Sequence, residues 1–484
     1  MHKSNLIELL KVFTPKEFKE LGEFVNSPFF NKNENVIKLY NYIKKYFPDL
    51  ENVNLKKRKV YEVMTGEDNY SDGFMRSVIF NLSKLTEEYL SAKSFPQIEK
   101  DITYLDLLFR RPGADKLFEK KFKQVYESFG NENNKDQFHY YCLYRLQALL
   151  MSYNSKNRAF LNIKDFHADD EINTLDSLLT FYLLAALPEY RFFHNQTRVI
   201  NINIEFNFLD EILNFLKRSG FYKKNPELNL FYNEIQLIKE NDEKYFYELK
   251  EFAKKEIDNF RFGIKFNAIG LLANTAITLY YEGNDKFLNE RFEIYQLILE
   301  KGLYKKFETS YFDDMLFKNI VSTGLQLNKV EWTEEFLREY IDKINPDDKD
   351  NALNLNLARL KFYKKNFTEA LEHLSIIKNV NHIHYKTEIK ILTLMIYYEL
   401  SMSIDAMAVI DSYRHFLSND TLIPELRKER NYNFIRIVND LIKSKENRSL
   451  KAAYDIEHEI KITPNTYEKE WLQLKTEELI KELK

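Results

Sequence analysis

Glycine and proline are scarce in this chain. Its 484 residues include only 11 Gly and 10 Pro, a combined share of about 4%, whereas average proteins carry about 12%. These two residues form most of the tight turns that connect short strands. Their scarcity argues against sandwiches, barrels and doubly wound sheets, which need many such turns. It predicts long helices joined by polar connectors.

Cysteine and tryptophan are also rare. The single cysteine, Cys142, excludes a disulfide within the chain, and it lies in an apolar helical pattern, where we expect a small core residue. Tryptophan occurs only twice, but the chain has 39 Phe and 32 Tyr. Each aromatic side chain can bury roughly 150–250 Å². The chain therefore has ample apolar surface for a helical core.

Motifs that carry known chemistry are absent from the sequence. It contains no GxSxG elbow, no HExxH pair and no glycine-rich phosphate loop. The histidines His373, His382 and His384 have no carboxylate or thiol at a metal-ligand spacing, and the loop TGEDNYSDG does not fit a calcium-binding loop. We therefore expect no enzyme activity, no catalytic residues, no cofactor and no metal.

Neither one sign of charge nor a long apolar stretch dominates the chain. The sequence has 71 Lys and Arg against 74 Asp and Glu, a formal net charge of -3, so no chain-wide field favours nucleic acid or anionic lipid. The longest apolar run, residues 178–188, is about half as long as a membrane-spanning helix. The first residues lack the apolar stretch of a signal peptide. We expect a cytoplasmic protein that does not enter a membrane.

Residues 345–380 carry the clearest helical pattern. In LNLARLKFYKKNFTEALEHLSIIKNV, residues 355–380, apolar residues recur every three or four positions in two blocks on either side of KKN. The preceding NPDDKDN supplies the cap and negative charge that helix N-termini favour. This region therefore predicts a helix, a short turn and a second helix.

The hairpin resembles a tetratricopeptide repeat. The small residue, the aromatic residue and the alanine of that repeat match Ala358, Phe367 and Ala370, although Lys365 replaces the usual glycine. A shift of 36 residues reaches Ser403 and Ala406, and a shift of 35 in the other direction reaches Trp332. We therefore predict an all-α fold, a superhelical array of antiparallel helix pairs that forms a degenerate tetratricopeptide-like solenoid.

The pattern also predicts a division of the chain into four parts. A small N-terminal helical domain takes residues 1–95, and a connecting helical region follows at 96–230. The repeats occupy 231–445, and capping helices close the array at 446–484, where the sequence becomes more polar.

A wider resemblance covers most of the chain. The blocks FTPKEFKELGEFVNSPFFNKN, FKNIVSTGLQLNKVEWTEEFLREY and MIYYELSMSIDAMAVIDSYRHFL resemble an uncharacterised group of large bacterial tetratricopeptide-like helical-repeat proteins. That group has no known activity or binding residues. The resemblance therefore implies the helical-repeat architecture and says nothing about chemistry.

The predicted architecture favours protein binding. Stacked hairpins form an extended concave face lined by the first helix of each pair, which suits a peptide or a helix of another protein. We therefore predict a noncatalytic scaffold or adaptor, with Arg359 and Tyr363 reaching solvent along the groove. The expected partner-binding residues are Leu355, Arg359, Phe362, Tyr363, Glu388, Met395 and Tyr398.

One segment supports a different hypothesis. Residues 55–90 are predicted to form a helix, a turn and a second helix, with a basic cluster at Lys56, Lys57, Arg58 and Lys59. The second helix offers few cations that could contact phosphate or guanine. A nucleic-acid-binding regulator is thus the alternative function, and an enzyme with a dispersed active site comes third.

Overall fold

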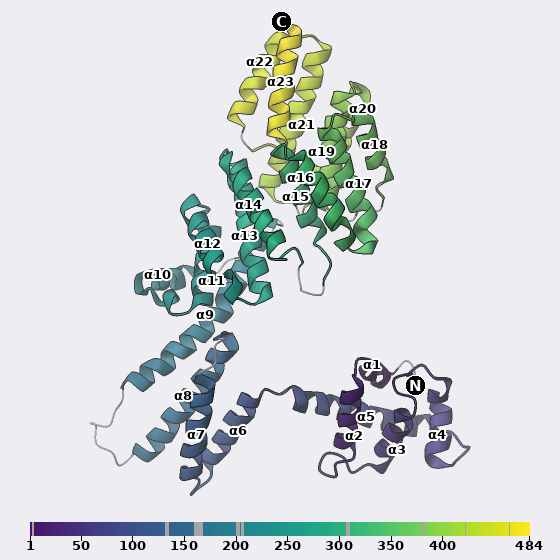
Figure 1. The fold of residues 1–484 in the computed structure, drawn as a ribbon, viewed down its shortest axis with the longest axis vertical. Coiled ribbons are helices and arrows are strands. Elements are labelled where there is room, and N and C mark those ends of the chain that lie inside the picture. The colour runs from purple at the N-terminus through teal and green to yellow at the C-terminus, as the bar shows by residue number, and fades with distance from the viewer. Residues whose placement is uncertain are drawn as a thin grey trace. The chain divides into compact units, whose positions relative to one another are not determined.

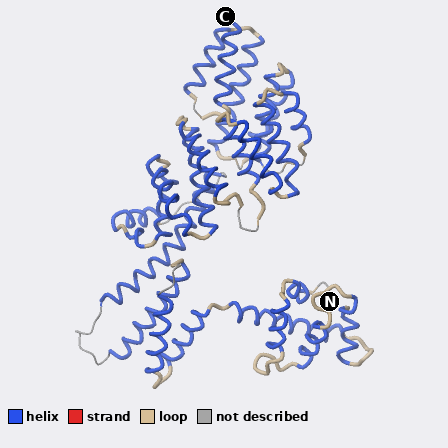
Figure 2. Tube along the Cα trace, in the orientation of Figure 1, coloured by secondary structure: helices blue, strands red, loops and turns tan. Residues whose placement is uncertain are grey.

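The computed structural model describes the chain except residues 2–3, 131–134, 159–167, 200–203, 205–207, 306–309, 379, 381–382, 422 and 464. The described residues are mostly helical and contain no strand (Figure 2). Isolated β-bridges join Lys305 to Phe312 and Phe312 to Ile344. The predicted all-α class is therefore confirmed.

The chain forms two compact units. One comprises Met1–Asn134 and Tyr141–Leu175, and the other comprises Lys135–Tyr140 and Asp176–Lys484. This division follows the packing of the backbone and does not test the four parts predicted from the sequence, which remain a prediction.

The first helices of the chain have two separate cores. The buried side chains of α1 to α5 form one, and those of α6 to α8, including Cys142, form the other. The expectation that Cys142 is a core residue is therefore confirmed. These helices are α1 (Asn5–Lys11), α2 (Pro15–Val25), α3 (Glu34–Lys44), α4 (Lys57–Thr65), α5 (Asp72–Ser94), α6 (Gln97–Arg110), α7 (Asp115–Gly130) and α8 (Gln137–Arg158).

The remaining helices form the second unit, except for the first residues of α9. They are α9 (Ala168–Val199), α10 (Leu209–Ser219), α11 (Pro226–Glu240), α12 (Glu243–Glu256), α13 (Phe262–Tyr281), α14 (Lys286–Glu300), α15 (Asp314–Gln326), α16 (Val330–Tyr340), α17 (Pro346–Tyr363), α18 (Phe367–Ile376), α19 (Ile383–Glu399), α20 (Ser403–Asn419), α21 (Glu425–Glu446), α22 (Leu450–Ile462) and α23 (Lys469–Leu483).

Consecutive helices of the second unit pack in pairs. The pairs are α13 with α14, α15 with α16, α17 with α18, α19 with α20, and α21 with α22 (Figure 1). The first helices also pack on one another in order, from α15 through α17, α19 and α21 to α23. The helix pairs predicted from residues 345–380 are therefore confirmed.

The start of α17 shows how the sequence fixes a helix boundary. The Asn345 side chain accepts a hydrogen bond from the Asp347 N–H at 3.1 Å. Pro346 opens the helix, and Asp347 and Asp348 lie in its first turn. The cap and the negative charge expected from NPDDKDN are both present, and each stabilises the N-terminal end of the helix.

In each of these five pairs, the turn contains one residue in the left-handed region. Its φ angle is 100° at Gly283, 56° at Asn328, 61° at Lys365, 58° at Ser401 and 48° at Arg448. In every case the next residue donates its N–H to the carbonyl five positions back, as from Asn366 to Lys361 at 2.9 Å. This is the Schellman motif, which usually has glycine at the left-handed position. The same Schellman turn thus recurs in all five pairs, but only one of them has glycine at the left-handed position.

The structure corrects the sequence register of one repeat. Asn328 and Lys365 are the left-handed residues of successive turns, and each lies two positions before the start of the next helix. Val330, the first residue of α16, therefore corresponds to Phe367, the first residue of α18. The predicted alignment of Trp332 with Phe367 is therefore wrong. Trp332 of α16 packs against the preceding pair, because its ring lies 4.7 Å from the Phe292 ring of α14 and 5.7 Å from the Phe336 ring of its own helix.

The helix α13 carries a long, mainly apolar stretch. Within the described residues, α13 is the helix that is long and apolar enough to cross a membrane by length and composition. Ile269, Leu272 and Ala276 of α13 lie in the main core cluster of this unit. The core helix of a globular unit passes the same test of composition, so the composition of α13 fits a helix in the core of the second unit.

The first prediction concerns the close contacts inside the pairs. Ala370 of α18 and Ala406 of α20 are completely buried. A leucine at either position has no free space, so we expect Ala370→Leu and Ala406→Leu each to lower the free energy of unfolding by about 1–3 kcal/mol. Urea denaturation measures the change.

Ala92→Leu, at an exposed position of α5, is the control and should change stability by less than about 0.5 kcal/mol. Equal stability of all three variants would contradict the packing described here.

Candidate protein-interaction face

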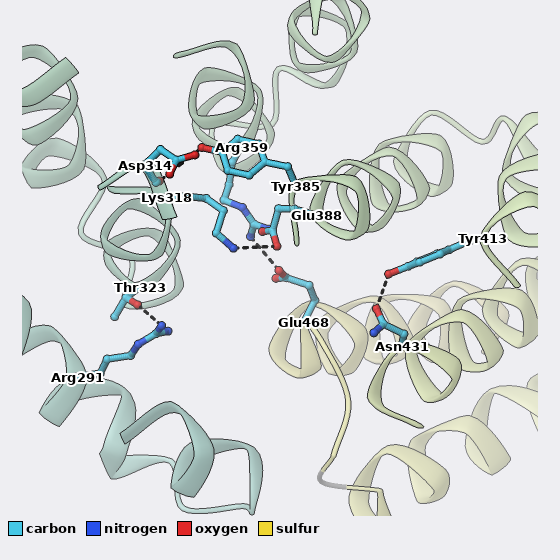
Figure 3. Close-up of polar contacts among 10 residues, drawn as sticks. All are labelled: Arg291, Asp314, Lys318, Thr323, Arg359, Tyr385, Glu388, Tyr413, Asn431 and Glu468. Atoms are coloured by element: carbon cyan, nitrogen blue, oxygen red, sulfur yellow. Dashed lines mark hydrogen bonds and ion pairs between the residues drawn. The ribbon is translucent and has the colours of Figure 1, made fainter. Parts of the chain in front are cut away.

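A buried ion-pair network lies on the first helices of the pairs. The Arg359 side chain of α17 is only 2% exposed. It donates from Nη2 to a Glu388 carboxylate oxygen of α19, and from Nη1 to Glu468 Oε1 at 2.8 Å. The Lys318 Nζ of α15 lies 3.4 Å from Glu388 Oε2. Figure 3 shows both cations pointing toward the Glu388 carboxylate.

The two carboxylates of this network respond differently to burial. Burial alone would raise the pKa of Glu388, but Arg359 and Lys318 together lower it to about 2. For Glu468, burial raises the pKa and the charge of Glu388 raises it further, and these effects outweigh the attraction of Arg359. The same burial lowers the pKa of Lys318. The network therefore stabilises the charged form of Glu388, whereas it leaves the charged form of Glu468 less stable than in water.

Glu468 belongs to the end of the chain. It directly precedes α23 and lies 109 residues from Arg359 in sequence. We call residues 465–475 the C-terminal segment, and we call the side of α13, α17, α19 and α21 that it covers the candidate face. The segment contacts each of these four helices.

The aromatic part of this contact centres on Trp471. Its ring lies 5.5 Å from the Tyr398 ring and 6.4 Å from the Phe362 ring. The indole Nε1 donates to Glu399 Oε1 at 2.8 Å, and the Lys475 Nζ lies 2.9 Å from the same oxygen. Trp471 is therefore held by rings on α17 and α19 and by one hydrogen bond to α19.

A second group of contacts holds the start of the segment. The Tyr467 ring lies 5.7 Å from the Tyr281 ring of α13, and the Arg430 guanidinium lies 3.7 Å from the centre of the Tyr281 ring. The Arg430 Nε also donates to Asn465 Oδ1 at 2.8 Å. The hydroxyl of Tyr280 donates to the Glu470 carboxylate. Polar and aromatic contacts thus both hold the segment.

The structure brings together several residues predicted to bind a partner. Arg359 and Glu388 form the ion pair, and Phe362 and Tyr398 are the two rings around Trp471. Leu355 and Met395 are core residues, and Tyr363 is half-buried. No bound partner tests these seven residues, so their role in binding stays a prediction.

One part of that prediction is wrong. Arg359 was expected to reach solvent along a groove, but it is almost completely buried. The physical reason is that the carboxylates of Glu388 and Glu468 pair with its guanidinium, and the C-terminal segment covers it. A charge reversal at Arg359 would place a third carboxylate beside these two, so it would test folding rather than binding.

Sequence reasoning missed three residues of the site. Lys318, Glu468 and Trp471 lie far from Arg359 in sequence, and no local pattern links them to it. The available signal was the stretch NTYEKEW, which places acids beside Tyr and one of only two Trp residues in a polar terminal region. Aromatic residues in such a region indicate a buried contact.

The alternative segment at residues 55–90 forms two helices, α4 and α5. Its cations bond to neighbouring side chains: Lys57 Nζ lies 3.3 Å from Asp72, Arg58 Nε lies 3.3 Å from Glu62, and Lys59 donates to Asn54. The two ion pairs reduce the charge available to phosphate, whereas the hydrogen bond from Lys59 to the neutral Asn54 leaves the charge of Lys59 unchanged. Nucleic-acid binding stays a prediction, with no added support from this geometry.

Within the described ranges, no group of three or more His, Cys, Asp or Glu side chains is placed to hold a metal ion. His382 lies outside those ranges. The expected absence of a metal or cofactor stays a prediction.

The chain was compared with known proteins in three ways. A scan of protein-family models, a search of curated proteins and a search of solved structures each found no match. The resemblance to bacterial tetratricopeptide-like proteins therefore stays a prediction. The description that these findings support is an all-α protein containing successive helix pairs.

Proposed function

We propose that this chain is a noncatalytic protein-interaction scaffold or adaptor, built as a tetratricopeptide-like superhelix and located in the cytoplasm. Its candidate face binds a peptide or a helix of a partner protein. One observation carries the proposal: this face already holds a short stretch of polypeptide, the C-terminal segment, through contacts with four different helices.

The chemistry of these contacts supports a binding role. Arg, Tyr and Trp are the residues that dominate binding energy at protein interfaces, above all where they are buried at the centre. Here Arg359 and Tyr398 contribute from the array, and Trp471 contributes from the bound segment. A helix lying along other helices with apolar and polar anchors is a common mode of peptide recognition.

The test is affinity capture of the tagged full-length chain after chemical cross-linking, with and without nuclease. We expect a protein partner that resists nuclease and is cross-linked to Lys445. This lysine borders the candidate face, because its Nζ lies 5.2 Å from the Tyr398 ring. Loss of every partner after nuclease, with cross-links at Lys57 and Lys59, would instead support the nucleic-acid alternative.

A further inference from the structure

The C-terminal segment fits the candidate face imperfectly. Glu468 has a φ of 51° and a ψ of 42°, in the left-handed region that is strained for a residue with a side chain. Its neighbour Arg359 also keeps an unused donor, since the buried Nε has no hydrogen-bond acceptor among the described residues. A ligand without this strain, with a carboxylate that also reaches Nε, would bind the face better.

The segment nevertheless defines the chemistry that the face accepts. A carboxylate at position 468 meets the Arg359 guanidinium just before a helix begins, and an aromatic ring at position 471 packs between Phe362 and Tyr398. The second acid, Glu470, accepts a hydrogen bond from Tyr280. The contacts therefore select an acidic helix start followed by an aromatic side chain.

We propose, on the basis of the function proposed above, that the partner of the candidate face is a helix that opens with a carboxylate and carries an aromatic side chain three positions later. This partner helix displaces the chain's own C-terminal segment. Both ligands need the Arg359 guanidinium and the space between Phe362 and Tyr398, so they cannot bind together.

The tether sets the strength of this competition. A segment joined to its own binding site by a short connector reaches an effective concentration in the millimolar range. In the full chain the face is therefore mostly occupied, and a partner helix must bind tightly or be present at high concentration. Weakening the segment by mutation should open the face to a ligand added in trans.

The experiment uses a fluorescent peptide with the sequence of residues 465–484 and the full-length protein. We expect the Trp471→Ala protein to bind this peptide at least tenfold more tightly than the wild-type protein does, as measured by fluorescence anisotropy. Leu474→Ala is the matched control, because Leu474 lies on the same helix with its side chain exposed, and it should behave like the wild type. A peptide carrying Glu468→Lys should lose at least tenfold in affinity for the Trp471→Ala protein.

Several outcomes would overturn this inference. A Trp471→Ala protein that is folded by circular dichroism and does not bind the peptide would reject it, as would equal binding to the wild type and the variant. If the variant does not fold, excess peptide must increase amide hydrogen exchange of α23 in the wild-type protein, and unchanged exchange would reject the proposal. Dimers of the variant in analytical ultracentrifugation would assign the face to a second copy of the chain instead.

Failure of the inference is distinguishable from failure of the proposed function. A nuclease-resistant partner cross-linked at Lys445, together with no peptide binding, would keep the scaffold and reject the acidic aromatic helix as its ligand.

Discussion

Arg359→Met is expected to lower the free energy of unfolding of the second unit by about 3–5 kcal/mol, the usual cost of removing one partner from a buried ion pair. Without the guanidinium, the carboxylates of Glu388 and Glu468 remain buried together, and only Lys318 is left to compensate Glu388. Urea denaturation followed by circular dichroism measures the loss.

Two further variants test the cause of this effect. Adding Glu468→Gln to Arg359→Met removes the carboxylate that is left without a cation, while Glu388 keeps Lys318, and we expect this double variant to recover most of the lost stability. Arg58→Met removes an exposed cation that pairs with Glu62 and should change stability by less than about 1 kcal/mol. A double variant as unstable as Arg359→Met would show that packing, rather than charge, causes the loss.

The second large effect depends on pH and involves Glu234 of α11. Its side chain is completely buried, and Arg191 Nη1 of α9 lies 2.8 Å from its Oε2. Its Oε1 has no hydrogen-bond donor among the described residues. Burial raises the pKa of Glu234 from 4.5 to about 7, because the loss of hydration outweighs the attraction of Arg191.

The sign of the pH dependence follows from the direction of this shift. Between pH 4.5 and about 7 the folded chain holds a proton on Glu234 that the unfolded chain releases. The stabilisation is therefore full below pH 4.5 and is lost as pH rises through 7, a change of about 3 kcal/mol. The Glu234→Gln variant lacks this titration. We therefore expect its free energy of unfolding, relative to that of the wild type, to increase from pH 5 to pH 8.

The measurement compares urea denaturation of the wild type and Glu234→Gln at several pH values, so that other titrating groups cancel. Asp210→Asn is the control, because Asp210 pairs with Lys239 at an exposed position, and its difference from the wild type should stay nearly constant. A constant difference for Glu234→Gln as well would contradict the raised pKa.

Local features were predictable from the sequence. The scarcity of Gly and Pro predicted the helical class, and the apolar spacing of residues 345–380 predicted α17, its turn and α18. The cap at Asn345 was also predictable, because capping depends on a few adjacent residues. The register of the preceding pair was not, since Asn328 and Lys365 replace the glycine that would have marked both turns.

The candidate site was only half predictable. A repeat register assigns Arg359 and Phe362 to one face of a helix, but it cannot show what covers that face. The covering residues Glu468 and Trp471 come from a distant segment, and their contacts depend on how the whole array folds. The prediction that Arg359 is exposed is wrong because the C-terminal segment of the same chain covers this side chain.

The C-terminal segment also has a mechanical consequence. In most repeat arrays each unit contacts only its neighbours, so the array bends and stretches like a spring. Here one segment connects α13 directly to α21, through Tyr467 on Tyr281 and Asn465 on Arg430. The segment therefore adds to the direct contact between Arg430 and the Tyr281 ring and restrains the separation of α13 from α21. We expect its release to leave that single contact between the two helices and to let them move apart more easily.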